Sequence, residues 1–559
     1  MISSALGTSI IGVVVLLGGL IFFHELGHYL IAKLFKVKVE VFSLGFGKKL
    51  IRKRVGETEY CLSLIPFGGY VKLMGDDPYK GVPAEEAARA FSTQRLYKRF
   101  AIVAAGPMFN LILAFVLYVA VFWLGQPLPG SRVGSVVVAS PAWEAGIRPR
   151  DLITEVDGKK VQTWPEIEEA LKFKQGQPSQ LLVKRGDTEI RIPYQVAMVR
   201  ARNPYGEEEE VGGLKGAIPY PWAPKVGVSD PNSLAFKAGL RTGDLIAKIG
   251  SREIAVYEEI NDALLANWKD GEPLAISVKR PRADKKDEST DMNFSVVLPK
   301  APVAGKLSLF GAGETLGLYP SEVFVKRVEK DSPAAKGGLE AGDRIVKVGE
   351  NSVYNFDSIV EKVQDQGPRA EAVKFTLERG GKTQVLNLSP VETELKDPIS
   401  QKPFKRYMVG FEPTLAYSDA EVIRVKYHEP VALISHAGFE TWIITKRTMV
   451  SLYKLVTRKI DVKHLGGPIM IARVAGQSLD AGIVPFLQMM SVISINLFLL
   501  NLFPIPILDG GHLLFFTIEA IKGKPVSIRT MEIATQIGMV FILMLVGLTI
   551  FNDITRYIH

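Results

Sequence analysis

Cysteine is nearly absent from this chain of 559 residues, which contains only Cys61. A disulfide within the chain and a metal cluster held by several thiolates are therefore excluded. Histidine is also scarce, with seven residues, so each one can be examined separately as a ligand or catalytic group. No run of lysine and arginine with interleaved aromatic residues occurs, and the net charge of +9 is modest, so nucleic-acid binding is not indicated.

Long apolar segments are present, although 23% of the residues are charged. Four segments come close to the ~20 residues that a membrane-spanning helix requires, namely residues 9–32, 100–124, 484–503 and 537–551. The first could instead be a signal peptide, but no basic stretch precedes it and no cleavage site of small residues follows it. Residues 430–457 are interrupted by charged residues and are interpreted as an interfacial amphipathic helix.

Positive charge is concentrated beside the apolar segments. Residues 31–99 contain fourteen lysines and arginines, and Lys522, Lys524 and Arg529 precede the last apolar segment. Both regions are predicted to face the cytoplasm, because lysine and arginine are enriched in cytoplasmic loops. The long polar region 125–430 then lies on the opposite side, which is the periplasm in a Gram-negative bacterium.

The middle of the chain contains three copies of one pattern. Each copy carries a glycine, an aspartate and an isoleucine at matching spacings, namely Gly146, Asp151 and Ile153, then Gly239, Asp244 and Ile246, then Gly338, Asp343 and Ile345. Neighbouring aspartates are 93 and 99 residues apart, which is the length of a small domain. A helix-like and then a strand-like stretch follow each pattern, so a repeated α/β domain is predicted.

The repeated pattern, close to A-G-φ-x-x-x-D-x-I-x-x-φ with φ apolar, resembles the PDZ domain. The resemblance implies three inserted PDZ domains, at residues 126–200, 222–300 and 315–393, with linkers at 201–224 and 301–315. PDZ domains bind peptide termini by adding the peptide as a strand at a sheet edge. Any copy could instead be a spacer that binds nothing, because the pattern reveals no side chain that contacts a peptide.

A polar insert, His24-Glu25-Leu26-Gly27-His28, interrupts the first apolar segment. Two histidines four residues apart lie on one face of a helix, so their ring nitrogens can reach a single zinc ion. Glu25 beside them could take a proton from a water on that ion. Ionisable groups inside a membrane helix cost about 3 kcal/mol each and are functional by default. Alternatively, the helix ends at Phe23 and the insert is a solvated cap.

A catalytic zinc site needs a third protein ligand and one open position. The candidate is Asp509, in the sequence NLFPIPILDGGH, where Pro504 and Pro506 break the third apolar segment. From the residues alone, an Asp-Gly turn at the membrane boundary is an equally good reading. His512, three residues further on, is a weaker alternative ligand.

Taken together, these motifs resemble the site-2 protease family of intramembrane zinc metalloproteases. The resemblance rests on HELGH, on NLFPIPILDGG (501–511), on FSTQRLYKRFAIVAAGPMFNLILA (91–114) and on LGGPIMIA (465–472). It implies that His24, His28 and Asp509 bind Zn²⁺ and that Glu25 acts first as general base and then as general acid. The family's members commonly carry two PDZ domains, so a third copy in this chain is a departure from their pattern.

The resemblance also implies residues that contact the substrate. Asn501 would contact the substrate backbone or the developing oxyanion, although an interhelical hydrogen bond is an alternative role. Residues 59–75 alternate like a hairpin strand and resemble the family's membrane-associated β-loop, in which Gly68 and Gly69 would let an unwound substrate approach. A simple cytoplasmic hairpin is the alternative, and Cys61 within it is interpreted as a packing residue.

The expected fold is therefore a multi-pass α-helical membrane protein, with about four transmembrane helices and three inserted PDZ domains. Residues 1–125 and 420–559 form its membrane parts, in the inner membrane, with the PDZ domains periplasmic and the zinc site towards the cytoplasmic side. The expected substrates are single-pass membrane proteins, such as an anti-sigma factor or remnant signal peptides, already cut by another protease. The competing hypotheses are a proteolytically inactive PDZ adaptor and a secreted zinc protease. A serine protease is not indicated, because the sequence contains no Gly-x-Ser-x-Gly element.

Overall fold

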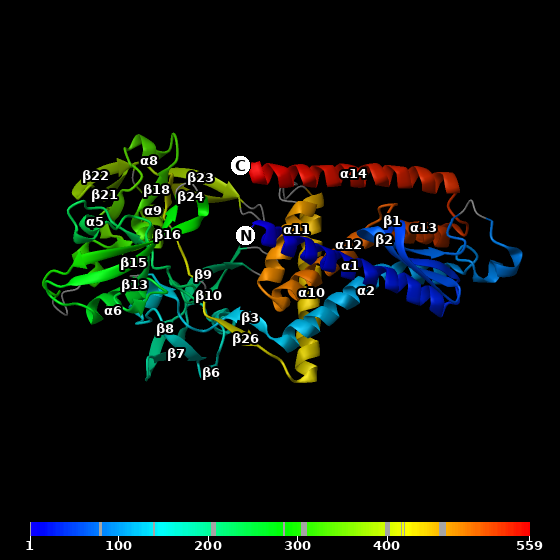
Figure 1. The fold of residues 1–559 in the computed structure, drawn as a ribbon, viewed down its shortest axis with the longest axis horizontal. Coiled ribbons are helices and arrows are strands. Elements are labelled where there is room, and N and C mark those ends of the chain that lie inside the picture. The colour runs from blue at the N-terminus through cyan, green and yellow to red at the C-terminus, as the bar shows by residue number, and fades with distance from the viewer. Residues whose placement is uncertain are drawn as a thin grey trace. The chain divides into compact units, whose positions relative to one another are not determined.

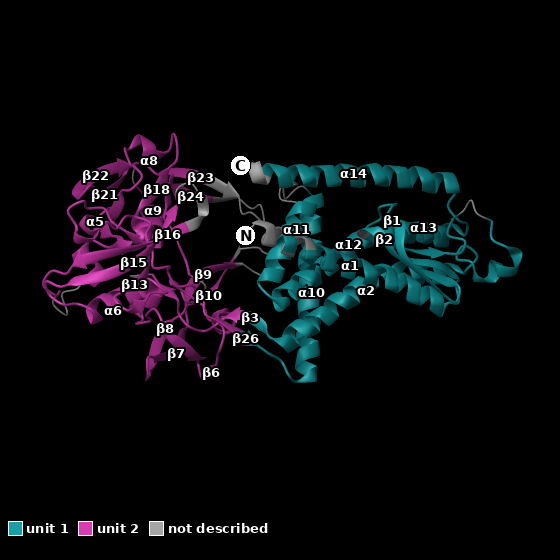
Figure 2. Ribbon diagram, in the orientation of Figure 1, with its two compact units in different colours: residues 1–127, 203–207, 424–559 teal, residues 128–202, 208–423 magenta. Residues whose placement is uncertain are grey.

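The computed structural model describes residues 2–77, 81–137, 140–202, 208–282, 285–302, 310–369, 371–396, 403–414, 416–418, 420–457 and 466–558 (Figure 1). The chain forms two compact units (Figure 2). Unit 1 comprises residues 1–127, 203–207 and 424–559, and unit 2 comprises residues 128–202 and 208–423. Each unit has its own core, as the pattern of apolar ends and a polar middle predicts.

Unit 1 consists mainly of long helices. Its described elements are α1 (Ile2–Leu34), β1 (Val39–Val55), β2 (Thr58–Leu73), the 3₁₀ helix η1 (Ala84–Arg89), α2 (Leu96–Leu124), α10 (Pro430–Val456), α11 (Pro468–Asp480), α12 (Ile483–Leu502), α13 (Asp509–Lys522) and α14 (Ile528–Ile558). The short strands β3 (Gln126–Pro129) and β26 (Val422–Val425) lie where the chain passes between the units.

Within the described residues, four helices are long and apolar enough to cross a membrane. They are Ile11–Leu34, Leu96–Leu124, Ile483–Leu502 and Ile528–Thr555, which confirms the four expected segments. The last helix begins nine residues earlier than its apolar run, because residues 528–536 contain no glycine or proline that would end a helix. α10 is not among these four, and its interfacial position stays a prediction.

α2 is the central helix of unit 1 and packs against α1, α10, α12 and α13. Leu113 of α2 is buried with Leu16 and Leu20 of α1 and Phe486 of α12. Small residues permit the closest approach, since a Cβ on Gly27 of α1 would lie 2.4 Å from the carbonyl oxygen of Ala105. Close packing of small residues is the usual means of helix association in membranes, where apolar burial gives little driving force.

β1 and β2 form a long antiparallel hairpin that packs against α1. The sequence predicts a strand at residues 59–75, and β2 confirms it with an end at Leu73. β1 was not predicted, because its second half, Lys48 to Val55, is rich in lysine and arginine and exposed on both faces. Cys61 lies within β2 and is a buried free thiol, in agreement with a packing role.

Unit 2 contains three four-stranded sheets, each with its own core. The described elements are β4 (Ser135–Val136), α3 (Pro141–Glu144), β5 (Leu152–Val156), β6 (Lys159–Lys160), α4 (Trp164–Leu171), β7 (Pro178–Arg185), β8 (Thr188–Gln195), β9 (Ala197–Arg202), β10 (Glu208–Gly213), β11 (Ala217–Ile218), β12 (Val226–Gly227), α5 (Leu234–Ala238), β13 (Leu245–Ile249), β14 (Arg252–Glu253), α6 (Glu258–Ala266), β15 (Pro273–Arg282), β16 (Lys285–Val297), α7 (Ala312–Leu316), β17 (Tyr319–Pro320), η2 (Ser321–Val323), β18 (Val325–Val328), α8 (Pro333–Lys336), β19 (Arg344–Val348), β20 (Asn351–Ser352), α9 (Phe356–Gln366), β21 (Val373–Arg379), β22 (Lys382–Leu388), β23 (Val391–Lys396), β24 (Pro403–Met408) and β25 (Phe411–Pro413). The strand orders are β6-β5-β7-β8, β14-β13-β15-β16 and β20-β19-β21-β22, so the three copies share one topology.

The recurring aspartate is buried and makes the same ion pair with a partly exposed arginine in each copy. Asp151 pairs with Arg185 at 2.7 Å, Asp244 with Arg280 at 2.7 Å and Asp343 with Arg379 at 2.6 Å. Each arginine also donates to the carbonyl oxygen of the recurring glycine. That glycine has a positive φ in all three copies, between 82° and 106°, a conformation that side chains disfavour. The pair therefore explains why glycine and aspartate recur together.

A late strand closes each copy by pairing with its first strand. β11 pairs with β4, β17 with β12 and β25 with β18. These closing strands follow residues 200, 300 and 393, where the sequence analysis expects the domains to end. The expectation that 201–224 is only a linker was wrong, since it carries β10 and β11, and the described part of 301–315 includes the start of α7. Two-residue strands are too short to give a readable alternation of apolar residues.

Candidate metal centre

α1 presents the two histidines of HELGH on one face. The helix continues without interruption to Leu34, so the alternative in which it ends at Phe23 is wrong. The imidazole rings of His24 and His28 lie one turn apart, with centroids 4.9 Å from each other. Their side chains are only 16% and 14% exposed, so both are held within the packed part of unit 1.

Asp509 is placed by a tight connection between α12 and α13, of which it is the first residue. A Cβ on Gly510 would lie 2.2 Å from the carbonyl oxygen of Phe503, and one on Gly511 would lie 2.4 Å from Cα of Pro506. Only glycine can occupy these positions without moving the backbone. The Asp-Gly-Gly sequence therefore turns the chain sharply enough for the carboxylate to reach α1.

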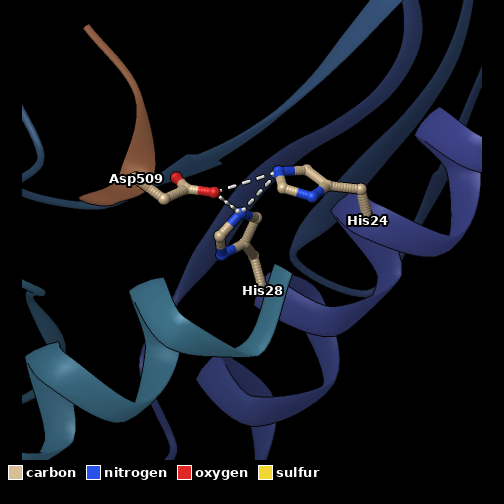
Figure 3. Close-up of side chains that lie close together, drawn as sticks. All are labelled: His24, His28 and Asp509. Atoms are coloured by element: carbon tan, nitrogen blue, oxygen red, sulfur yellow. Dashed lines mark hydrogen bonds and ion pairs between the residues drawn. The ribbon is translucent and has the colours of Figure 1, made fainter. Parts of the chain in front are cut away.

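The three side chains point toward one another (Figure 3). Nε2 of His24 and Nε2 of His28 are 3.3 Å apart, and they lie 3.1 Å and 3.6 Å from Oδ2 of Asp509. Among the described residues they form the one group of three or more such ligands that could share a metal ion. The structure therefore brings together all three residues expected to be ligands, across about 480 residues of chain.

The donor set and its spacing fit zinc. A tetrahedral ion with bonds of about 2.0–2.1 Å separates its ligand atoms by roughly 3.3 Å, close to the three observed distances. Asp509 Oδ2 is buried and accepts no hydrogen bond from the described residues. Two ring nitrogens with free lone pairs beside a carboxylate oxygen would repel each other, whereas a cation between them makes all three contacts favourable.

α2 packs against the two histidine rings at Gly106. A Cβ on Gly106 would lie 2.2 Å from Nε2 of His28 and 2.9 Å from Cε1 of His24, so only glycine leaves room for the rings. Nδ1 of His28 lies 2.8 Å from the carbonyl oxygen of Ile102, and Nδ1 of His24 lies 3.3 Å from Nδ2 of Asn110. The sequence analysis did not assign roles to these three α2 residues, although the segment 91–114 that resembles the site-2 protease family contains all three.

The hairpin lies against Glu25. A Cβ on Gly69 would lie 3.1 Å from Cγ of Glu25 and 2.9 Å from the carbonyl oxygen of Ser43, so β2 passes close to α1 at this point. Gly68 has φ of 136° and packs against the ring of Phe46 in the same hairpin.

Asn501 and His512 lie outside the three-residue cluster. Asn501 occupies the last turn of α12 and is partly exposed, and among the described residues no hydrogen bond joins its side chain to the three ligands. His512 has an exposed side chain and lies beside Phe515, with ring centroids 6.5 Å apart. The geometry therefore favours Asp509 over His512 as the third ligand.

Comparison with known proteins extends over nearly the whole chain. The sequence profile described as Peptidase family M50 matches residues 12–545. The chain is 32% identical over 548 residues to the regulator of sigma-E protease RseP of Escherichia coli, covering 97% of each chain. It is 30% identical over 550 residues to the protease RseP of Yersinia pestis, covering 98% of each.

A solved PDZ domain protein from Parabacteroides distasonis aligns with 51% of this chain and 95% of its own, at 11% identity. The TM-score of 0.13 is too low for an argument about the fold of the repeats. The family assignment rests instead on the profile match and on the full-length relatives. The chain belongs to Peptidase family M50, the site-2 protease family.

Proposed function

We propose that this chain is an intramembrane zinc metallopeptidase that performs regulated proteolysis of membrane proteins, with His24, His28 and Asp509 as its zinc ligands. The observation that carries the proposal is the convergence of two ring nitrogens and one carboxylate oxygen at 3.1–3.6 Å from one another. The site lies in a unit whose described residues include four helices able to cross a membrane. Membership of Peptidase family M50 and full-length relatives named as proteases support the same activity.

Bound zinc would supply a water of lowered pKa and a Lewis acid at the scissile carbonyl. Glu25 takes the proton from the attacking water and then delivers it to the leaving amine. Asn501 would stabilise the developing oxyanion with its side-chain amide.

The proposed substrates are single-pass membrane proteins, such as an anti-sigma factor, or remnant signal peptides. A transmembrane helix hides its backbone, so the segment to be cut must first unwind. The β1–β2 hairpin is suited to binding the unwound strand by edge pairing, since strands readily add to a sheet edge. Gly69 carries no side chain, which lets β2 lie close to Glu25 of α1.

The three repeats of unit 2 are proposed to be PDZ domains. Their shared strand order and the recurrent Asp–Arg pair support a common fold. The strands that close the copies extend the proposed domains to about residues 218, 320 and 413. We propose that they bind peptide termini and exclude substrates with intact ectodomains, so that cleavage follows an earlier cut by another protease.

The inner membrane is the proposed location, with unit 2 periplasmic and the zinc site towards the cytoplasmic side. The charge bias of residues 31–99 supports this orientation. A secreted zinc protease would be released from membranes by alkaline carbonate, whereas the proposed enzyme stays in the pellet.

Cleavage of a transmembrane reporter by the wild type and by Glu25→Gln tests the proposal. Glu25→Gln is expected to lose all measurable cleavage while it retains zinc, because the amide cannot accept the proton. Asp509→Ala is expected to lose both cleavage and zinc. If the Glu25→Gln variant cuts the reporter as fast as the wild type, the proposed proteolytic mechanism is wrong. If neither the wild type nor the variant cuts any reporter, a proteolytically inactive adaptor becomes the better interpretation.

A further inference from the structure

The two imidazoles of the proposed zinc site each need a defined tautomer. Their Nε2 atoms converge with Asp509, so these atoms must carry the free lone pairs that face the ion. A neutral imidazole then carries its proton on Nδ1 and needs an acceptor there. His28 has such an acceptor, the carbonyl oxygen of Ile102 at 2.8 Å.

His24 faces a side-chain amide instead of a backbone carbonyl. Nδ2 of Asn110 lies 3.3 Å from Nδ1 of His24, so two donors would meet once Nδ1 carries the proton. Asn110 is fully buried, and its Oδ1 has no hydrogen-bond partner among the described residues. A half-turn of the amide about its Cβ–Cγ bond exchanges the two ends at almost no steric cost.

We infer that Asn110 is a positioning residue for zinc, which turns its Oδ1 toward His24 and accepts the hydrogen bond from Nδ1–H. The turn moves the NH₂ group to the place now held by the unpartnered oxygen. The turned amide gains a hydrogen bond from the imidazole of His24. An imidazole that binds a cation is a stronger hydrogen-bond donor than one that does not. This inference rests on the proposed zinc site and deepens it.

The backbone of α2 holds Asn110 in place. Its carbonyl oxygen accepts a hydrogen bond of 2.6 Å from the Ser494 hydroxyl of α12, and Gly106 one turn earlier lets α2 approach the two rings. Carbonyl groups of a helix point toward its C-terminus, whereas side chains lean toward its N-terminus. Ile102 and Asn110 therefore reach inward from both sides of Gly106 and meet rings that are only one turn apart.

Two substitutions separate an acceptor role from a donor role. Asn110→Asp keeps an oxygen beside Nδ1–H and removes the NH₂ group, whereas Asn110→Leu keeps the volume and removes both. Asn496→Leu is the matched control, since Asn496 lies in α12 and accepts a hydrogen bond from Thr448 away from the zinc site. All are made in the full-length chain, purified in detergent, and compared in zinc affinity by competition with a chelator.

Asn110→Leu is expected to weaken zinc binding by about 10- to 100-fold, the usual effect of losing an outer hydrogen bond to a metal ligand. Asn110→Asp is expected to bind zinc at least as tightly as the wild type, and Asn496→Leu to match the wild type. The absorption spectrum of the Co²⁺-loaded protein should change with Asn110→Leu and not with Asn496→Leu. If Asn110→Leu does not fold, Asn110→Asp decides alone.

Equal zinc affinity of the wild type and Asn110→Leu would overturn the inference, as would a zinc affinity for Asn110→Asp that is about 10-fold or more below that of the wild type. Either result leaves the zinc site itself standing. By contrast, a wild-type protein that binds no zinc, or a His24→Ala variant with unchanged affinity, contradicts the proposed function and the inference with it.

Discussion

Gly106 separates the backbone of α2 from both histidine rings. A methyl group there would lie 2.2 Å from Nε2 of His28, far closer than atoms can approach. Gly106→Ala is therefore expected to displace the ring and lower zinc occupancy at least 10-fold, as losses around metal ligands commonly do. Zinc per protein after dialysis measures this effect. Gly18→Ala in α1 is the control, because nothing lies within 4 Å of its added Cβ, and a matching loss in that variant would refute the steric explanation.

Glu258, at the start of α6, is a carboxyl group without a hydrogen-bond partner for its buried Oε2. Burial raises its pKa from 4.5 to about 7, and the nearby Glu259 adds to this. Because the folded state then binds more protons than the unfolded state between these pH values, stability falls as pH rises from about 4.5 to 7. Deprotonation should remove up to about 3 kcal/mol of stability at pH 8.

The Glu258→Gln variant tests this titration. Its urea midpoint, followed by tryptophan fluorescence of the full-length protein, should match the wild type near pH 4.5 and exceed it at pH 8. Glu253→Gln, an exposed position in β14, should follow the wild type at both values. A midpoint difference for Glu258→Gln that is the same at both pH values would contradict the proposed titration.

Among single residues, the sequence identified the proposed zinc ligands better than the residues that contact those ligands. The i, i+4 spacing of His24 and His28 is a local pattern, and α1 confirms that both lie on one face. The residues next to Asp509 in the sequence did not decide whether it is a metal ligand or a turn residue, because Asp-Gly also occurs in ordinary turns. Asn110 could not be assigned, because its contact with His24 depends on how two helices pack and no local spacing encodes that.

At the scale of elements, one carboxylate joins α14 to the start of α11. Asp553 is fully buried and accepts hydrogen bonds from the backbone N–H groups of Gly467, Ile469 and Met470 at 2.9–3.1 Å. It thereby caps the N-terminus of α11 from another helix. α11 in turn packs against α1, which carries the histidines.

Asp553→Ala is expected to lower stability by about 2 kcal/mol, because three donors at a helix N-terminus lose their acceptor. The thermal unfolding of the detergent-solubilised protein checks this expectation. Asp553→Asn keeps one carbonyl oxygen and should lose less than Asp553→Ala. If Asp553→Ala unfolds at the wild-type temperature, the cap does not contribute to stability.

Elements with a strong local pattern were predictable and the others were not. Four apolar runs gave the four candidate spans, and the alternation of residues 59–75 gave β2. β1 was missed because its second half is rich in lysine and arginine. No residue pattern within β1 indicates that it pairs with β2. The two-residue closing strands β11 and β17 were missed for a related reason, since their pairing defines them and their composition does not.

For the whole molecule, the charge distribution predicts which side of the membrane each region faces. The single native cysteine makes this measurable, because Cys61→Ser gives a chain without thiols. In that background, Lys330→Cys in unit 2 should react with an impermeant maleimide added to spheroplasts. Lys53→Cys in β1 should react only after lysis, since residues 31–99 are predicted to be cytoplasmic. The reverse labelling pattern would contradict the proposed orientation.

The distance along the chain between His28 and Asp509 has a consequence for biosynthesis. About 480 residues must be translated after the second histidine before the carboxylate exists. At ~5–20 residues per second, ribosomes need roughly 25 to 100 seconds for that stretch. The nascent chain would therefore already contain α1, α2 and the hairpin before its third zinc ligand is translated. It could not cleave neighbouring membrane proteins until translation is almost finished.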